Sequence, residues 1–231
     1  MEHFGDKPYI ARGAQIDPKR VFFFGDPTRS LSMDIDIAPG YGYLPPGTVL
    51  AEITSEATRK KIWIPYAKEN PAADVVNFFG AFLLANGSAA DTDLEVTLED
   101  SYKFRVGDHV AVADNDTNGA SAVDCGAISA IDRTTYPNKA ILTIPETVTT
   151  AITTAANGAV YIQTSAAAPF TKAAGFLFGG VDTGTGENSI GAQGVVLLSH
   201  AMLYKGTLTN YDSEAMADLG ASENGQYVIL K

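Results

Sequence analysis

Acidic and amide side chains between residues 114 and 119 come closer to a metal site than any other pattern in this chain. The segment reads Asp114-Asn-Asp-Thr-Asn-Gly119 and matches the opening of a calcium-binding loop. Its candidate ligands are Asp114, Asp116 and Asn118. The twelfth position of such a loop holds a bidentate glutamate, whereas here it is Cys125. Because the same residues are common in hairpin turns, we predict neither a metal nor a cofactor.

The other polar groups do not combine into a catalytic site. Asp34 and Asp36 alternate along one face of a predicted strand, and they would imitate a glycosidase pair only beside a substrate cleft. Ser199 and His200 are adjacent in another predicted strand, so they point to opposite faces and cannot readily form a nucleophile–base pair. None of the three histidines lies at metal-ligand spacing with another His or Cys. We therefore predict that the protein is not an enzyme.

Two further features have the composition of ligand sites. Trp63 is the sole tryptophan, and it would either stack on a sugar or anchor a core or an interface; we expect the second role. The segment from Gly184 to Gly191 is rich in glycine but lacks the Lys-Ser/Thr of a phosphate-binding loop and the Gly-x-Gly-x-x-Gly spacing. We predict that it belongs to a flexible loop spanning Gly179–Gly194.

Composition excludes several classes of protein. The chain has 231 residues and a formal net charge of −11, and an acidic surface repels phosphate backbones, so we predict no nucleic-acid partner. The apolar stretch Phe78–Ala85 is too short to span a bilayer, and the N-terminus lacks the pattern of a signal peptide. Cys125 is the only cysteine, which excludes an intrachain disulfide and predicts a small buried side chain.

Short strands dominate the predicted secondary structure. Leu31–Ile37 alternates cleanly and predicts a half-buried strand, with Leu31, Met33, Ile35 and Ile37 on one face. Thr48–Thr54 and Lys61–Tyr66 read as the two strands of a hairpin. Further candidate strands, separated by turn signals, are Leu94–Leu98, Lys103–Val106, His109–Ala113, Ala127–Asp132, Ala140–Ile144 and Ala159–Gln163. This spacing is typical of a small barrel or sandwich.

The last residues predict a strand, a short helix and a closing strand. Val195–Tyr204 is apolar, Thr209 or Asn210 would cap the helix, and Gly220 would follow its last turn. We therefore divide the chain into an extended arm (1–20), a discontinuous β domain (21–88 and 166–231) and an inserted small β domain (89–165). The predicted fold class is mainly β with a few short helices.

Two stretches resemble the head decoration proteins of bacteriophages, the capsid-stabilising class typified by the lambda head protein. One is the hairpin Pro46-Gly-Thr-Val-Leu-Ala-Glu-Ile53 followed by Lys61-Ile-Trp-Ile-Pro-Tyr66. The other is the tail from Tyr204 to Gly220, which is similar to the family's strand, Leu-Thr turn and short Ala-rich helix. The resemblance covers about residues 1–86 and 170–231, and the insert departs from the compact members.

The resemblance implies a structural virion protein, made in the host cytoplasm, that binds the outer surface of the phage capsid. Its partner would be the major capsid protein, and a homotrimer would stabilise the shell against DNA pressure. The N-terminal arm would lie along the shell, with capsid contacts from Phe4, Tyr9, Ile10 and Arg12. The alternatives are another phage component, namely a head fibre, a tail tube or a glycan-binding adhesin.

Overall fold

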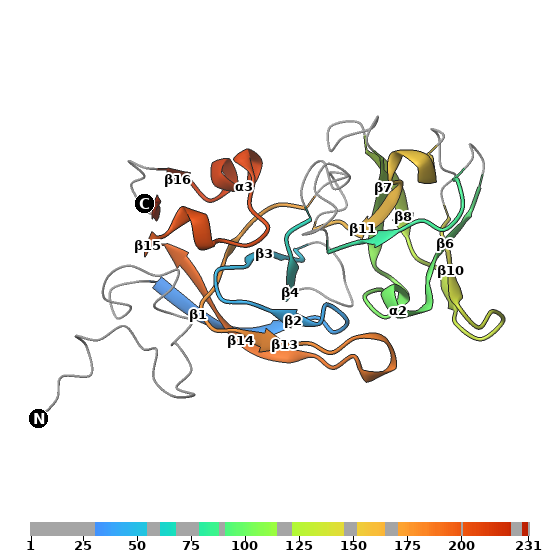
Figure 1. The fold of residues 1–231 in the computed structure, drawn as a ribbon, viewed down its shortest axis with the longest axis horizontal. Helices are drawn as coiled ribbons and strands as arrows, with labels where there is room; N and C mark the ends of the chain where they lie inside the picture. Colours follow the sequence, from blue (N-terminus) through green and yellow to red (C-terminus); the bar gives the residue numbers. More distant parts are fainter. Residues whose placement is uncertain are drawn as a thin grey trace, which may run out of the picture.

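Two β bodies lie side by side in the computed structural model, a closed barrel and a second body made by the middle of the chain (Figure 1). The mainly β fold class predicted from the sequence is confirmed. The structure describes residues 31–54, 61–67, 79–87, 91–114, 122–145, 152–164, 171–199, 201–222 and 228–230.

The barrel has five strands in the order β1-β14-β12-β3-β4. Its strands are β1 (Leu31–Ile37), β3 (Val49–Glu52), β4 (Ile62–Pro65), β12 (Gly175–Leu177) and β14 (Ala192–Ser199). β3 and β4 form the predicted antiparallel hairpin. The barrel closes where β1 and β4 run parallel, with Asp36 opposite Ile62 and Ile37 opposite Trp63.

The barrel interior is filled by alternate side chains of these strands, as the pleat of a strand requires. Ile35, Ile37 and Trp63 pack there with residues of β12 and β14, and Trp63 is only 2% exposed. The core role expected for Trp63 is confirmed. Leu31 and Met33 were predicted on the same buried face, but both are exposed, because β4 pairs only with the last two residues of β1.

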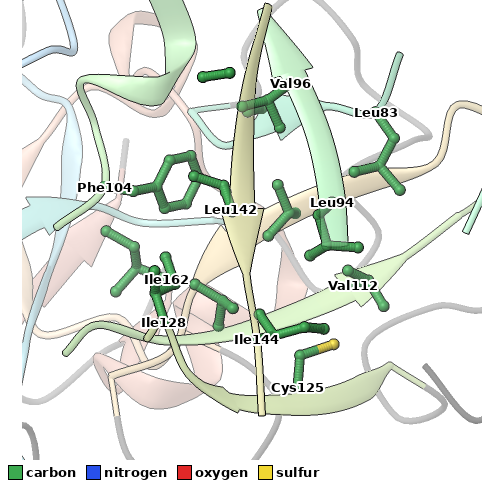
Figure 2. Close-up of a cluster of buried hydrophobic side chains, with 14 of the residues drawn as sticks. Leu83, Leu94, Val96, Phe104, Val112, Cys125, Ile128, Leu142, Ile144 and Ile162 are labelled. Carbon is green, nitrogen blue, oxygen red and sulfur yellow. The ribbon is translucent and has the colours of Figure 1, made fainter. Parts of the chain in front are cut away.

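The second body contains two sheets that pack face to face. Their orders are β6-β10-β9 and β5-β11-β7-β8. The strands are β5 (Ala81–Phe82), β6 (Asp93–Thr97), β7 (His109–Ala113), β8 (Val123–Ala127), β9 (Ala130–Asp132), β10 (Lys139–Thr143) and β11 (Ala159–Ile162). Figure 2 shows Leu142, Ile144 and Cys125 in the cluster between them. Cys125 is fully buried, as predicted.

The hydrophobic core of the second body continues into the barrel. Ala51, Ile53 and Ile64, from the β3–β4 hairpin and the residue after β3, belong to the same buried cluster as Leu142 and Cys125. The strand β5 comes from the segment before residue 89, yet it pairs with β11 of the second body. The second body therefore packs directly against this hairpin, whereas the barrel interior around Trp63 forms a separate buried cluster.

A close backbone contact also joins the two bodies. Gly40 has φ +96°, and a Cβ atom there would lie 2.9 Å from the backbone nitrogen of Lys103. The Lys103 ammonium donates a hydrogen bond of 2.7 Å to the carbonyl oxygen of Gly80, at the entry to β5, and pairs with Asp100. The contact therefore depends on a residue without a side chain at position 40.

Two strand predictions in the second body are wrong in detail. Lys103–Val106 is not a strand, because helix α2 (Leu98–Ser101) precedes it and the chain turns after the helix. The Thr97 hydroxyl caps this helix by accepting a hydrogen bond from Asp100 N. The predicted strand Ala127–Asp132 is divided between the end of β8 and β9. A short 3₁₀ helix, η5 (Thr154–Ala156), precedes β11.

The glycine-rich segment 179–194 is more regular than a flexible loop. It contains β13 (Val181–Asp182), the 3₁₀ helix η6 (Gly186–Asn188) and the start of β14, while β13 pairs with β2 (Tyr43–Leu44). Backbone hydrogen bonds from Thr183 N to Gly42 O and from Gly42 N to Gly184 O extend this ribbon. The loop prediction is therefore wrong, because tertiary pairing to a distant segment orders these glycines.

The tail follows the predicted order of strand, helix and strand. Its elements are β15 (Ala201–Leu203), the 3₁₀ helix η7 (Lys205–Thr207), α3 (Ser213–Asp218), β16 (Ala221–Ser222) and β17 (Val228–Leu230). The strand β17 lies between β15 and β16 and is parallel to both. Asp212 caps α3, rather than Thr209 or Asn210. Gly220 follows the helix with φ +58°, as predicted.

Candidate functional site

Of the three candidate calcium ligands, the structure describes only Asp114. Asp114 is 2% exposed, and its carboxylate accepts a 3.1 Å hydrogen bond from Thr153 N. Asp116 and Asn118 lie outside the described residues. Within the described part of the chain, no three His, Cys, Asp or Glu side chains are grouped to hold a metal ion. Asp114 thus has a structural bond that orients the start of η5.

Two other sequence hypotheses have clear outcomes. Trp63 cannot stack on a sugar in this fold, because its ring is enclosed by the barrel core. The proposed capsid contacts Phe4, Tyr9, Ile10 and Arg12, like the whole arm 1–20, lie outside the described residues.

Asp34 and Asp36 lie on the outer face of the barrel, as their alternation predicted. Asp34 is opposite Val195 and Asp36 is opposite Gln193 on β14. These four residues line a shallow hollow of about 480 Å³ along the β1–β14 ribbon. Both carboxylates are exposed and face solvent rather than an enclosed cleft. The arrangement is one of surface charge, and it suits a cationic partner better than acid–base chemistry.

The first half of β1 is a candidate docking element. Leu31 is 55% exposed and Met33 is 42% exposed, although both belong to a strand paired with β14, whose register shifts between Leu31 and Ser32. In Figure 1 this end of β1 extends away from the second body. Exposed apolar side chains on a strand that extends past one of its two neighbours are typical of a protein–protein contact.

Among the residues that the structure describes, the backbone of this half-strand is unpaired on one edge. β4 pairs only with Asp36 and Ile37, so no strand among the described residues pairs with positions 31–35 on that side. Ala38 N donates to Trp63 O of β4, which shows that even-numbered residues of β1 direct their backbone groups toward this edge. Ser32 and Asp34 therefore present their N–H and C=O groups there.

A second hollow lies at the other end of β1, between the barrel and the second body. It has a volume of about 360 Å³, and it is lined by Asp36, Pro39 and Ile62 of the barrel, by the start of β14, and by Arg105. Arg105 and Asp36 are both exposed. Asp36 and Gln193 line both hollows, so the two hollows form one continuous track along β1. The carboxylates of Asp34 and Asp36 lie along this track, and the guanidinium of Arg105 lies at its end.

The turn after β9 contains the two clearest electrostatic effects. Hydrogen bonds from Thr135 and Thr134 hold the pKa of Asp132 far below its usual value. Burial lowers the pKa of Arg133, whose guanidinium donates to the carbonyl oxygens of Ser101 and Phe104. Asp132 stabilises the turn itself and Arg133 fixes the turn against α2 and the residues that follow it, so we assign both a structural role.

Sequence reasoning missed the docking element, because apolar and polar residues alternate in the same way whether or not a neighbouring strand covers the whole length of β1. Leu31 and Met33 carry the same pattern as Ile35 and Ile37. Only the position at which β4 meets β1 separates the two pairs. Arg105 was likewise unremarkable in the sequence, since its neighbour Asp36 is distant along the chain.

None of the helices in the described residues has the length and apolar character needed to cross a membrane. No protein-family model, no curated protein and no solved structure matches this chain.

Proposed function

We propose that the protein is a virion decoration protein that binds the outer surface of a phage capsid and stabilises the shell against DNA pressure. The observation that carries this proposal is the exposed apolar start of β1, which directly follows residues 1–30. Leu31 and Met33 follow the predicted arm (1–20) at a distance of about ten residues along the chain, so we propose that a partner bound to the arm also contacts them. The resemblance of the hairpin and the tail to decoration proteins supplies the class of partner.

The hydrophobic packing between the barrel hairpin and the second body supports the same function. A protein that reinforces a pressurised shell has to transmit force without bending between its parts. Ile53 and Ile64 of the barrel region pack in one cluster with Leu142 and Cys125 of the second body. Because close-packed interiors have low compressibility, this shared core favours a stiff, two-part body that fits a structural role.

The proposed partner is the major capsid protein, and the proposed location is the outer face of the virion. The proposed assembly is a homotrimer whose arms, including Phe4, Tyr9, Ile10 and Arg12, lie along the shell. A strand added at an edge would give such an arm affinity through backbone hydrogen bonds.

Cosedimentation with capsid shells tests this function. The full-length protein is mixed with expanded, DNA-free shells of the major capsid protein encoded in the same genome, and the pellet is analysed after centrifugation. We expect saturable binding to the shells and a higher temperature of shell disruption when the protein is bound. Protein that stays in the supernatant at every ionic strength would refute the proposal.

A further inference from the structure

We infer that the edge of β1 along which no described strand lies accepts an extended strand from the partner in which apolar and basic side chains alternate. The identity of the partner in this inference rests on the proposed function. The binding chemistry of the surface is argued only from the described residues. It specifies which backbone groups bind, which side chains select the strand, and which charge the partner has.

The backbone groups come from Ser32 and Asp34. Their N–H and C=O groups face the edge that β4 leaves free, and the described residues form no hydrogen bond with them there. Lys61, the residue before β4, donates its N–H to Ile53 O instead of continuing the pairing along β1. A strand added in line with β4 would therefore bind the groups of these two residues without displacing a bond made by the described residues.

The side chains of this half-strand divide between two faces. Leu31 and Met33 are exposed on one face, and Ser32 and Asp34 are exposed on the other, where Asp36 continues the row. Side chains on adjacent strands pair across the sheet on the same face. The added strand would thus place apolar side chains beside Leu31 and Met33, and basic side chains beside the two carboxylates.

A second copy of this chain fits the edge poorly. Pairing two identical edges in either direction places carboxylates of Asp34 and Asp36 on the same narrow face, where like charges opposite one another are destabilising. Acidic residues on an exposed edge are also a known defence against self-pairing. The same charges favour a basic strand, so the surface selects a different polypeptide rather than another copy.

Binding of a labelled peptide tests this inference on the full-length protein. The probe is a ten-residue peptide that alternates lysine with valine, and the matched control alternates glutamate with valine; fluorescence anisotropy reports binding. We expect the lysine peptide alone to bind, more weakly as salt is added. The double variant Asp34→Asn/Asp36→Asn should weaken it about 2- to 30-fold, because each exposed ion pair contributes little by itself.

A charge-matched variant controls for net charge. Asp93→Asn/Glu214→Gln removes two exposed or half-exposed acids far along the chain from β1 and should leave the affinity unchanged. Equal affinity of the peptide for the Asp34/Asp36 variant and the wild type would overturn the inference.

Amide hydrogen exchange separates strand addition from loose electrostatic contact. In the free protein we expect the Ser32 and Asp34 amides to exchange quickly and the Met33 amide, which faces β14, to exchange slowly. Bound peptide should protect the first two amides. Binding without this protection, or protection of these amides before any peptide is added, would refute the proposal; the second result would identify another segment of the chain as the occupant.

The peptide-binding experiment and the shell-binding experiment can fail independently of each other. Wild-type protein that binds shells but not the peptide would overturn only the inference. Peptide binding by a protein that never binds shells would overturn only the decoration role.

Discussion

At the residue scale, the side chains with the largest energetic roles lie inside the molecule. Trp63 is enclosed by the barrel strands, where its ring contacts the side chains that close the β1–β4 junction. A large side chain in such a place contributes through burial and through the cavity that its removal would leave. The tryptophan that looks like a ligand platform in the sequence is thus a part of the fold.

We expect Trp63→Ala to lower the free energy of unfolding by about 3–5 kcal/mol. Ile190→Ala, at a side chain that is 62% exposed, should change it by less than about 0.5 kcal/mol. Urea denaturation followed by circular dichroism measures both variants. A loss for Trp63→Ala no larger than that for Ile190→Ala would contradict the burial of the ring.

The lowered pKa of Asp132 predicts a pH dependence of stability. Its ionised form is favoured in the folded state, so its contribution is present above the ordinary value of 3.8 and is lost as pH falls toward the lower folded pKa. The difference in unfolding free energy between wild type and Asp132→Asn should therefore be constant at neutral pH and shrink below about pH 4. A difference that grows on acidification would show that the hydrogen bonds from Thr134 and Thr135 do not favour the carboxylate.

At the scale of elements, the strand β1 has two different halves. Its second half closes the barrel, and its first half extends past β4 with no other described strand along that edge. The contact at Gly40 fixes the neighbouring loop against the chain that follows α2, and so holds the second body at one angle to the barrel.

Gly40→Ala tests that contact. The substitution adds a Cβ atom against the Lys103 backbone and forces alanine into a positive φ, so it should destabilise the protein by about 1–3 kcal/mol. Gly206→Ala is the matched control, because a Cβ there meets nothing within 4 Å. Thermal unfolding measures both, and equal melting temperatures would mean that the two bodies do not meet at Gly40.

The sequence predicted elements better than it predicted their partners. The strand Leu31–Ile37, the β3–β4 hairpin and β7 appear where periodicity placed them, because alternation is a local property. The order of segment 179–194 and the overhang of Leu31 depend on pairing with distant strands. Local patterns contain no information about such register, so the candidate site could not be located before the fold was known.

At the scale of the whole molecule, one buried cluster joins the β3–β4 hairpin of the barrel to the second body. Ala51 and Ile64 of the hairpin belong to this cluster, while Leu50 and Trp63 of the same strands belong to the separate cluster inside the barrel. A shared core couples the stability of its parts, because neither surface can be exposed alone without loss of the common packing.

The molecule should therefore unfold in one cooperative transition. Trp63 fluorescence reports on the barrel, and the reactivity of the buried Cys125 thiol reports on the second body. In a urea titration the two signals should change together. Separate midpoints would show that the bodies unfold independently and would weaken the case for a stiff structural protein.

The measurement that tests the central claim most directly is cosedimentation of surface variants with expanded capsid shells. Leu31→Asp/Met33→Asp places charges on the exposed start of β1, whereas Leu84→Asp/Ile190→Asp places them on exposed apolar side chains elsewhere. We expect the first variant to bind shells at least about tenfold more weakly than wild type, because burial of two apolar side chains is lost. The second should bind normally. Equal binding by wild type and both variants would contradict a role for β1 in docking, and no binding by any of them would contradict the decoration function itself.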